Sequence, residues 1–164
     1  MPLLLYPDRM TPFQIMPGHL IRRLNQISTS IFQQKMLDLK LDLTPVQFAA
    51  LATLQDNPGI DQATLAGLIA YDRVTIGGVV DRLEMKGLVA RAVNTRDRRA
   101  RLVSLTPAGA ALLARIVPEV AALQTGILGG LTEEERARFT ALAIKITEAS
   151  NERSRAPLRP RSDI

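Results

Sequence analysis

The sequence predicts a mainly α-helical fold with one small β-hairpin, and three observations lead to this prediction. Apolar residues recur at helical spacing along most of the 164-residue chain, a pattern typical of amphipathic helices. Two short segments, Leu88 to Val93 and Arg101 to Leu105, resemble strands instead and flank a charged turn. Only 4% of the residues are aromatic, so the core must be aliphatic.

The first predicted helix runs from Gly18 to Leu41 and is long enough to be an outer helix that packs on another element. Its apolar positions keep helical spacing: Leu20, Leu24, Ile27 and Ile31, with Phe32 beside them. Residues 1–43 are therefore expected to form an N-terminal arm followed by one helix.

Three further helices are predicted between residues 44 and 87 from their capping residues. Thr44 and Gln47 can form a capping box around Pro45, while Asp61 and Asp72 can each cap the helix that follows. The helix from Arg73 to Lys86 has a buried stripe of Ile76, Val79, Val80 and Leu83, and ends at Gly87. Two helices separated by a break at residues 70–72 indicate a helix-turn-helix.

The predicted hairpin directly follows this pair, which makes it a wing, so residues 44–106 are expected to form a winged helix-turn-helix. Thr106-Pro107 then opens a long helix with a bend at Pro118 and a stop at residues 129–130. Thr132 begins a last helix with a stripe of Phe139, Leu142 and Ile146. These two helices cover residues 107–151, and residues 152–164 are expected to be a basic, flexible tail.

Positive charge is concentrated on the wing. The formal net charge is +5 and the pI is near 10.2, which favours a polyanionic partner. A hairpin tip has no core to bury, so clustered arginines there face water or an anion, and the DNA minor groove and phosphates suit them. Asp97 can hold Arg99 in one rotamer. A solvated loop is the alternative. The candidate DNA contacts in this segment are Arg96, Asp97, Arg98, Arg99 and Arg101.

The Arg73 helix carries a second set of candidate DNA contacts on the face opposite its apolar stripe. Two adjacent interior glycines, Gly77 and Gly78, cost a helix roughly 1 kcal/mol each against alanine. Close approach to a DNA groove would compensate, and so would tight packing against another helix. Arg73 and Thr75 are expected to reach base edges and Arg82 a phosphate.

With these motifs in order, the chain resembles the MarR family of winged helix-turn-helix regulators from about Gly18 to Ile146. The most specific match is the wing signature D-x-R-x5-L-T, formed by Asp97, Arg99 and Leu105-Thr106. Three further segments look like family segments in the right order: Leu43 to Phe48, Val80 to Glu84 and Lys86 to Val89. One departure is that many relatives carry hydroxyl or basic side chains where Gly77 and Gly78 stand.

The resemblance implies a homodimer in which the first helix and the last two helices interlock as a dimerisation layer and two wings read a pseudo-palindrome. It also implies that Arg99 enters the minor groove, that Asp97 orients it, and that the Arg73 helix lies in the major groove. Because of the two glycines, base readout is expected to rest on Arg73 and Thr75.

Members of this family often repress a neighbouring gene and release DNA when a small acidic, commonly aromatic ligand enters a crevice between the dimerisation layer and the winged region. A cationic pair near the start of the first helix could hold a carboxylate or an acyl-CoA phosphate. Helix capping or salt bridges within the dimer are the alternative role of these residues. The candidate ligand-binding residues are His19, Arg22, Arg23 and Ser28.

Composition argues against other classes of protein. The chain has no cysteine and one histidine, and no glycine-rich phosphate loop, so we expect no catalytic residues, no metal site and no cofactor. We expect a cytoplasmic protein that does not enter a membrane, since no apolar run approaches the roughly 20 residues of a span and no secretion signal is found. The alternative to a ligand-controlled repressor is an architectural DNA-binding protein with little sequence preference.

Overall fold

The computed structural model describes residues 11–94 and 101–160, and the chain divides into two compact units, Met1–Asp42 and Leu43–Ile164. The first unit contains a short 3-10 turn, η1 (Pro12–Ile15), and the helix α1 (Pro17–Asp38). The helix ends three residues before the predicted Leu41. Lys40 adopts the left-handed conformation, with φ of 55°, and the N–H of Leu41 turns back to the carbonyl of Met36.

The second unit begins with the three capped helices α2 (Pro45–Asp56), α3 (Gln62–Leu68) and α4 (Arg73–Met85). Thr44, Asp61 and Asp72 accept backbone hydrogen bonds at the three N-termini, as the sequence predicts, and Thr44 and Gln47 form the expected capping box. The core of this unit is aliphatic, and its most buried side chains include Leu51, Leu54, Leu65, Ile76 and Leu83.

The break between α3 and α4 is a closed turn and not a loose loop. Ala70 adopts a left-handed conformation with φ of 54°, and the N–H of Tyr71 donates to the carbonyl of Ala66 at 2.9 Å. Many helices end with this hydrogen bond, and the left-handed residue just before its donor is usually glycine. Here that residue is Ala70. The turn fixes the direction in which α4 leaves α3.

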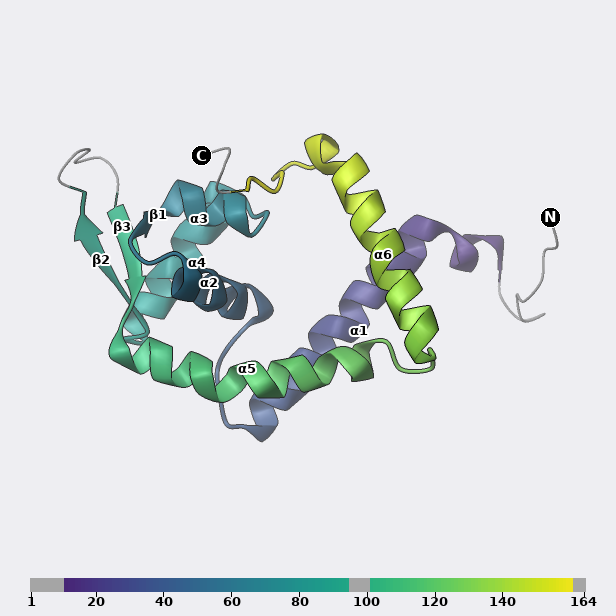
Figure 1. Cartoon of the computed structure of the whole chain (residues 1–164), viewed down its shortest axis with the longest axis horizontal. Coiled ribbons are helices and arrows are strands. Elements are labelled where there is room, and N and C mark those ends of the chain that lie inside the picture. Colours follow the sequence, from purple (N-terminus) through teal and green to yellow (C-terminus); the bar gives the residue numbers. More distant parts are fainter. Residues whose placement is uncertain (1–10, 95–100, 161–164) are drawn as a thin grey trace. The chain divides into compact units, whose positions relative to one another are not determined.

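The sheet has one strand more than the sequence predicts. The expected hairpin is present as β2 (Val89–Val93) and β3 (Arg101–Leu105), paired antiparallel with Val89 opposite Leu105. A third strand, β1 (Ile60–Asp61), pairs with the other side of β3, so the order is β1-β3-β2. Two residues carry no periodic signal, and only their pairing with β3 makes them a strand. Figure 1 shows the sheet beside α3 and α4.

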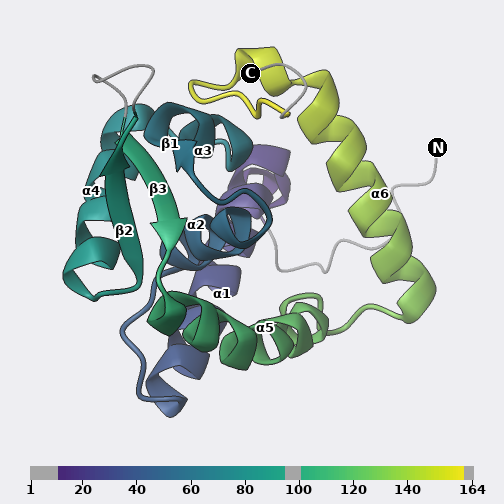
Figure 2. The same ribbon diagram turned by 60° about the vertical axis from the view of Figure 1, so that its left-hand side comes forward.

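The chain leaves the sheet through α5 (Pro107–Ile127), capped by Thr106, and continues into α6 (Glu133–Ala149). A Cβ on Gly109 would overlap the carbonyl of Leu88, so glycine allows α5 to start against the turn between α4 and β2 (Figure 2). Among the described helices, α5 alone combines the length and apolar composition of a membrane span, which many core helices share. No residue of α6 is buried.

After α6, the short 3-10 turn η2 (Asn151–Arg153) leads into residues 154–160. Where the sequence predicts a flexible tail, the structure shows specific hydrogen bonds. The N–H of Arg159 donates to the carbonyl of Gly67 on α3 at 2.9 Å. This contact joins residues far apart in the sequence and therefore leaves no local signal.

Candidate nucleic-acid interface

The first turn of α4 is exposed. Arg73, Val74 and Thr75 are all exposed there, and the side chain of Val74 is 88% accessible. The sequence places Val74 on this face without giving it a role. A recognition helix contacts base edges with its N-terminal residues, and a bare isopropyl group there suits the methyl group of thymine.

Asp72 holds this first turn in place. Its carboxylate accepts the N–H of Thr75 at 2.9 Å and the hydroxyl of Thr75 at 2.6 Å. These two hydrogen bonds are the main cause that lowers the pKa of Asp72 below its ordinary 3.8, so the cap stays ionised at neutral pH. Because the hydroxyl hydrogen of Thr75 is committed to Asp72, Thr75 can offer a base only an accepting lone pair and a methyl group.

Gly77 and Gly78 lie further along α4, where the described residues leave space around them. A Cβ on Gly78 would meet nothing within 4 Å, and one on Gly77 would come only within 3.8 Å of Gln62 Nε2. Packing among the described residues therefore does not require either glycine. Arg82 is exposed one turn later on the same helix.

Arg101 is the candidate wing contact that lies among the described residues. Arg101 is the exposed first residue of β3 and lies opposite Val93 on β2. Arg101 and Val93 are therefore the last pair of residues in the β2–β3 ladder. The candidate contacts Arg96, Asp97, Arg98 and Arg99 lie outside the described residues.

Arg91 on β2 joins the wing strands to α4, a role that the sequence analysis does not predict. Its guanidinium binds Asp81 and Glu84 of α4, each at 2.5 Å, and Gln62 of α3 at 2.9 Å. Burial would lower the pKa of Arg91, but the hydrogen bonds that its guanidinium donates to Asp81 and Glu84 outweigh burial and raise the pKa. The pairing also offsets the charge of Asp81 on a face proposed to approach phosphates.

The candidate ligand residues all lie on α1, within the first unit. His19, Arg22 and Arg23 share one turn at its start, and Ser28 lies about 180° around the helix from His19. The His19 ring is 4.6 Å from that of Phe13, and its Nδ1 is buried without a hydrogen-bond partner in the structure. Arg22 donates to Gln26 at 2.7 Å. The structure thus brings together the histidine and the two arginines, but not Ser28.

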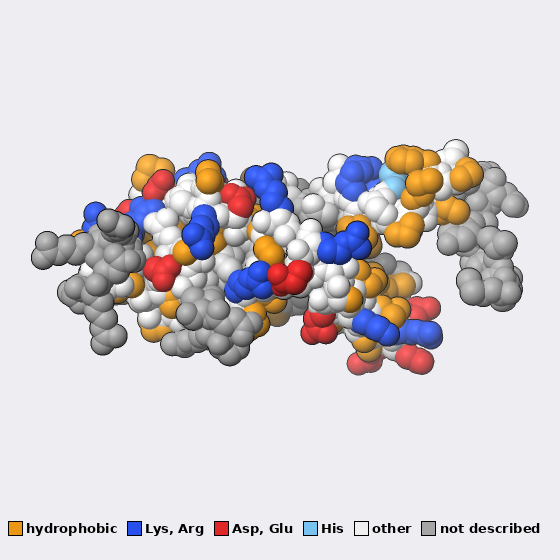
Figure 3. All heavy atoms as spheres, turned by 90° about the horizontal axis from the view of Figure 1, so that it is seen from above, with side chains coloured by type: hydrophobic (Ala, Val, Ile, Leu, Met, Phe, Trp, Pro, Cys, Tyr) orange, Lys and Arg blue, Asp and Glu red, His pale blue; other side chains and the backbone are white. Residues whose placement is uncertain are grey.

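Charge is finely mixed on the surface that can be seen. On the face shown in Figure 3, Lys and Arg side chains alternate with Asp and Glu side chains instead of forming one basic area. Attraction to a polyanion then depends on particular arginines more than on a broad field. Within residues 11–94 and 101–160, no group of three His, Asp or Glu side chains could hold a metal ion.

A helix-turn-helix whose second helix exposes its first turn, followed by a paired two-stranded wing, defines the class of winged helix-turn-helix DNA-binding proteins. The MarR family model matches residues 43–100. Together with the relatives described next, this match shows that the chain belongs to the MarR family of transcriptional regulators.

Similar proteins have been characterised. The transcriptional repressor NicR of Pseudomonas putida is 36% identical over 141 residues, covering 85% of this chain and 88% of NicR. The structure of BpsR of Bordetella bronchiseptica, whose DNA binding is regulated by 6-hydroxynicotinic acid, is 36% identical with a TM-score of 0.77 over 84% of this chain and 97% of BpsR. The repressor CouR bound to a 23-mer DNA duplex is 28% identical with a TM-score of 0.73, covering 88% and 99%.

Proposed function

We propose that this protein is a homodimeric, sequence-specific transcriptional repressor that leaves a pseudo-palindromic operator when it binds a small acidic aromatic ligand. The observation that carries the proposal is the exposed first turn of α4, held by Asp72 and offering Arg73 and Val74 to a groove. Regulators of the same family with this fold bind operator duplexes and respond to ligands.

We assign DNA contacts to two elements. On α4, Arg73, Val74 and Thr75 read base edges, the open surface at Gly77 and Gly78 allows close approach, and Arg82 contacts a phosphate. On the wing, Arg99 enters the minor groove with Asp97 as its partner, while the flanking cations contact phosphates: Arg96, Arg98 and Arg101.

The proposed dimer rests on the apolar surface of α6. Three large apolar side chains on one stripe of this helix are 38–60% exposed, and a single chain leaves them in water: Phe139, Leu142 and Ile146. Exposed apolar patches of this kind mark interaction surfaces. On α1, Ile21, Leu24 and Ile27 are likewise exposed. A second copy of the chain would bury both surfaces.

The proposed ligand is an acidic aromatic compound or its CoA thioester. Arg22 and Arg23, on the same helix turn as His19, offer positive charge for a carboxylate. BpsR, at 36% identity, responds to 6-hydroxynicotinic acid, which makes hydroxylated nicotinic acids the first compounds to test. The protein then acts in the cytoplasm by binding alone, without catalysis or a cofactor.

The test is fluorescence anisotropy on DNA from upstream of the gene and on a scrambled duplex, at about 150 mM salt. We expect a preference of about 10³ or more for the upstream DNA, relieved by one compound of the panel. Arg99→Ala should cost about 1–3 kcal/mol of DNA binding without loss of folding. Unchanged affinity in that variant would remove the wing from the interface.

An architectural DNA-binding protein remains the second candidate, because a basic wing also suits non-specific binding. Equal affinity for the two duplexes, insensitive to every compound, would favour that role. Arg73→Ala separates the two as well. If Arg73→Ala lowers the affinity for the upstream DNA alone, Arg73 reads a base, whereas an equal loss of affinity for both duplexes indicates a phosphate contact.

A further inference from the structure

The segment after α6 returns to the helix-turn-helix and lies against α3. Both ribbon views show it running from the end of α6 to α3, and the hydrogen bond from the N–H of Arg159 to the carbonyl of Gly67 fixes the contact. This places residues 154–159, named here the C-terminal segment, next to the start of the recognition helix.

The C-terminal segment is held by its own hydrogen bonds as well. The amide side chain of Asn151 accepts the N–H of Leu158 at 2.8 Å and donates to its carbonyl at 3.1 Å. The guanidinium of Arg159 binds both carboxylate oxygens of Glu152, at 2.6 and 2.9 Å. These contacts close a small loop, so Arg159 positions the segment and Arg155 projects from the middle of it.

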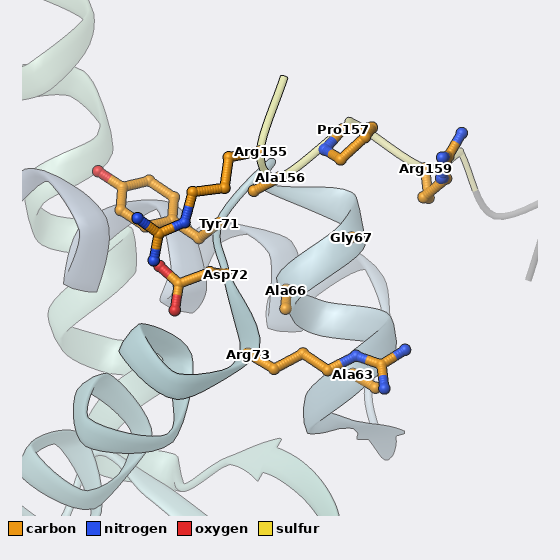
Figure 4. A pocket seen from close by; sticks show the side chains of 10 residues that line it. All are labelled: Ala63, Ala66, Gly67, Tyr71, Asp72, Arg73, Arg155, Ala156, Pro157 and Arg159. Atoms are coloured by element: carbon orange, nitrogen blue, oxygen red, sulfur yellow. The ribbon is translucent and has the colours of Figure 1, made fainter. Parts of the chain in front are cut away.

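A hollow of about 270 Å³ lies between this segment, α3 and the start of α4. Figure 4 shows that small residues of α3, Ala63, Ala66 and Gly67, form its floor. Arg73 extends along one side of the hollow and Arg155 along another. Both arginines are exposed, so the hollow is open to a ligand and has positive charge on two sides.

The position of the hollow indicates what can enter it. In helix-turn-helix proteins the first helix crosses the DNA backbone while the start of the second faces the major groove. Here the first helix is α3 and the second is α4, and the hollow lies at their junction. A phosphodiester group passing over α3 would meet Arg155, with the positive charge of Arg73 on another side of the hollow.

We propose that this hollow receives a phosphate of the DNA backbone that pairs with Arg155, while Arg73, assigned above to a base edge, adds positive charge on another side of the hollow without holding the phosphate. The C-terminal segment is then a third part of the DNA interface, besides α4 and the wing. This inference rests on the proposed function and extends it to a segment that lies beyond the matched family region, residues 43–100.

Asp72 is the acidic group beside Arg155, and its negative charge could repel a phosphate. Its hydrogen bonds explain why it does not prevent a phosphate from binding. Both of its carboxylate oxygens accept hydrogen bonds from Thr75. The attraction between Asp72 and Arg155 also contributes to the lowered pKa of Asp72, after the hydrogen bonds. Figure 4 shows the Arg155 guanidinium next to this carboxylate. Asp72 therefore orients Arg155, whose outer edge stays available to an anion.

The experiment compares Arg155→Ala with Arg153→Ala in the full chain. Arg153 is an exposed arginine two residues away that does not line the hollow, so it matches the change in net charge. Affinity for the operator and for a scrambled duplex is measured over a series of salt concentrations. Because both arginines are exposed, thermal melting should be the same in the two variants.

We expect Arg155→Ala to weaken binding to both duplexes about 3- to 10-fold, and to reduce the slope of log affinity against log salt by about 1, as for one lost phosphate contact. Arg153→Ala should have a smaller effect on both. Equal effects of the two substitutions, or tighter binding by Arg155→Ala, would overturn the proposal; the second result would mean that the segment covers the DNA surface.

A second pair of variants tests the floor of the hollow. Ala63 is exposed on α3, so Ala63→Glu should repel the phosphate and weaken binding more than Ala63→Gln, whereas equal affinities would contradict the proposal. The hollow could instead bind free anions and not DNA. In that case inorganic phosphate would raise the melting temperature of the wild type but not of Arg155→Ala, while the two proteins would bind DNA with equal affinity, and the proposal would be overturned. Failure of the proposed function has a different result: the wild-type protein would then bind the operator no more tightly than the scrambled duplex.

Discussion

The three helices α2, α3 and α4 and the helix α6 begin in the same way but have different surroundings. Thr44 starts α2 with a capping box to Gln47, and Thr132 starts α6 with a capping box to Glu135. Leu51 on α2 is fully buried, however, whereas Leu142 on α6 is 52% exposed. Local sequence thus determines where a helix begins, but burial depends on a packing partner. Among the described residues α2 is buried by such partners, whereas no residue of α6 is buried.

The largest effect is expected from shortening a side chain in the packed helices. Leu51→Ala should lower the free energy of unfolding by about 2–5 kcal/mol, because a fully buried leucine leaves a cavity that its neighbours fill only in part. Urea denaturation measures the loss. A loss of unfolding free energy below about 1 kcal/mol would mean that Leu51 is not part of a tightly packed core.

Shortening apolar side chains on α6 should weaken dimer formation and not the folding of the single chain. The double variant Leu142→Ala and Ile146→Ala removes apolar surface that is 52% and 60% exposed in the single chain. We expect the dimer dissociation constant to rise about 10- to 100-fold, equivalent to about 1.4–2.7 kcal/mol, as measured by sedimentation. Glu148→Ala, an exposed polar position on the same helix, is the control. An unchanged dissociation constant would assign the dimer contact to other helices.

The same contrast explains which features the sequence can predict. Helix starts at Thr44, Asp61, Asp72, Thr106 and Thr132 are predictable because each cap bonds to residues two or three positions away. Arg91 is not, since its partner Gln62 is 29 residues away. The strand β1 and the contact of Arg159 with Gly67 likewise exist only through tertiary pairing.

A capping change in the packed helices should have an intermediate, pH-dependent effect. Burial would raise the pKa of Asp61, but hydrogen bonds from Thr64 and Ala63 outweigh it and lower the pKa below 3.8. The stabilisation from this carboxylate is therefore present above the unfolded-state pKa and is lost as the pH falls through the folded-state pKa.

Asp61→Ala should cost about 1 kcal/mol at neutral pH, measured by urea denaturation. Asp61→Asn separates the charge from the cap, because asparagine caps about as well but does not titrate. The stability difference between wild type and Asp61→Asn should shrink as the pH is lowered below about 4. A difference that stays constant over that range would show that ionisation of Asp61 contributes nothing to folding.

The smallest effect is expected at the turn between α3 and α4. Ala70 and Gly87 hold the same left-handed position after α3 and α4, with φ of 54° and 69°, and the residue after each donates back into the helix, Tyr71 to Ala66 and Leu88 to Leu83. A left-handed alanine is strained by roughly 1–2 kcal/mol, whereas glycine adds entropy to the unfolded chain worth about 0.4–1 kcal/mol.

Ala70→Gly should therefore stabilise the chain by up to about 1 kcal/mol, and Gly87→Ala should destabilise it by a similar amount, both read from urea denaturation. The opposite signs come from the same geometry, so the pair tests whether the backbone at these two helix ends is as strained as φ indicates. If Ala70→Gly lowers stability instead, the restriction that alanine places on the unfolded chain outweighs the strain in the folded turn. Neither substitution should change the dimer dissociation constant, because both turns belong to helices that pack within the chain.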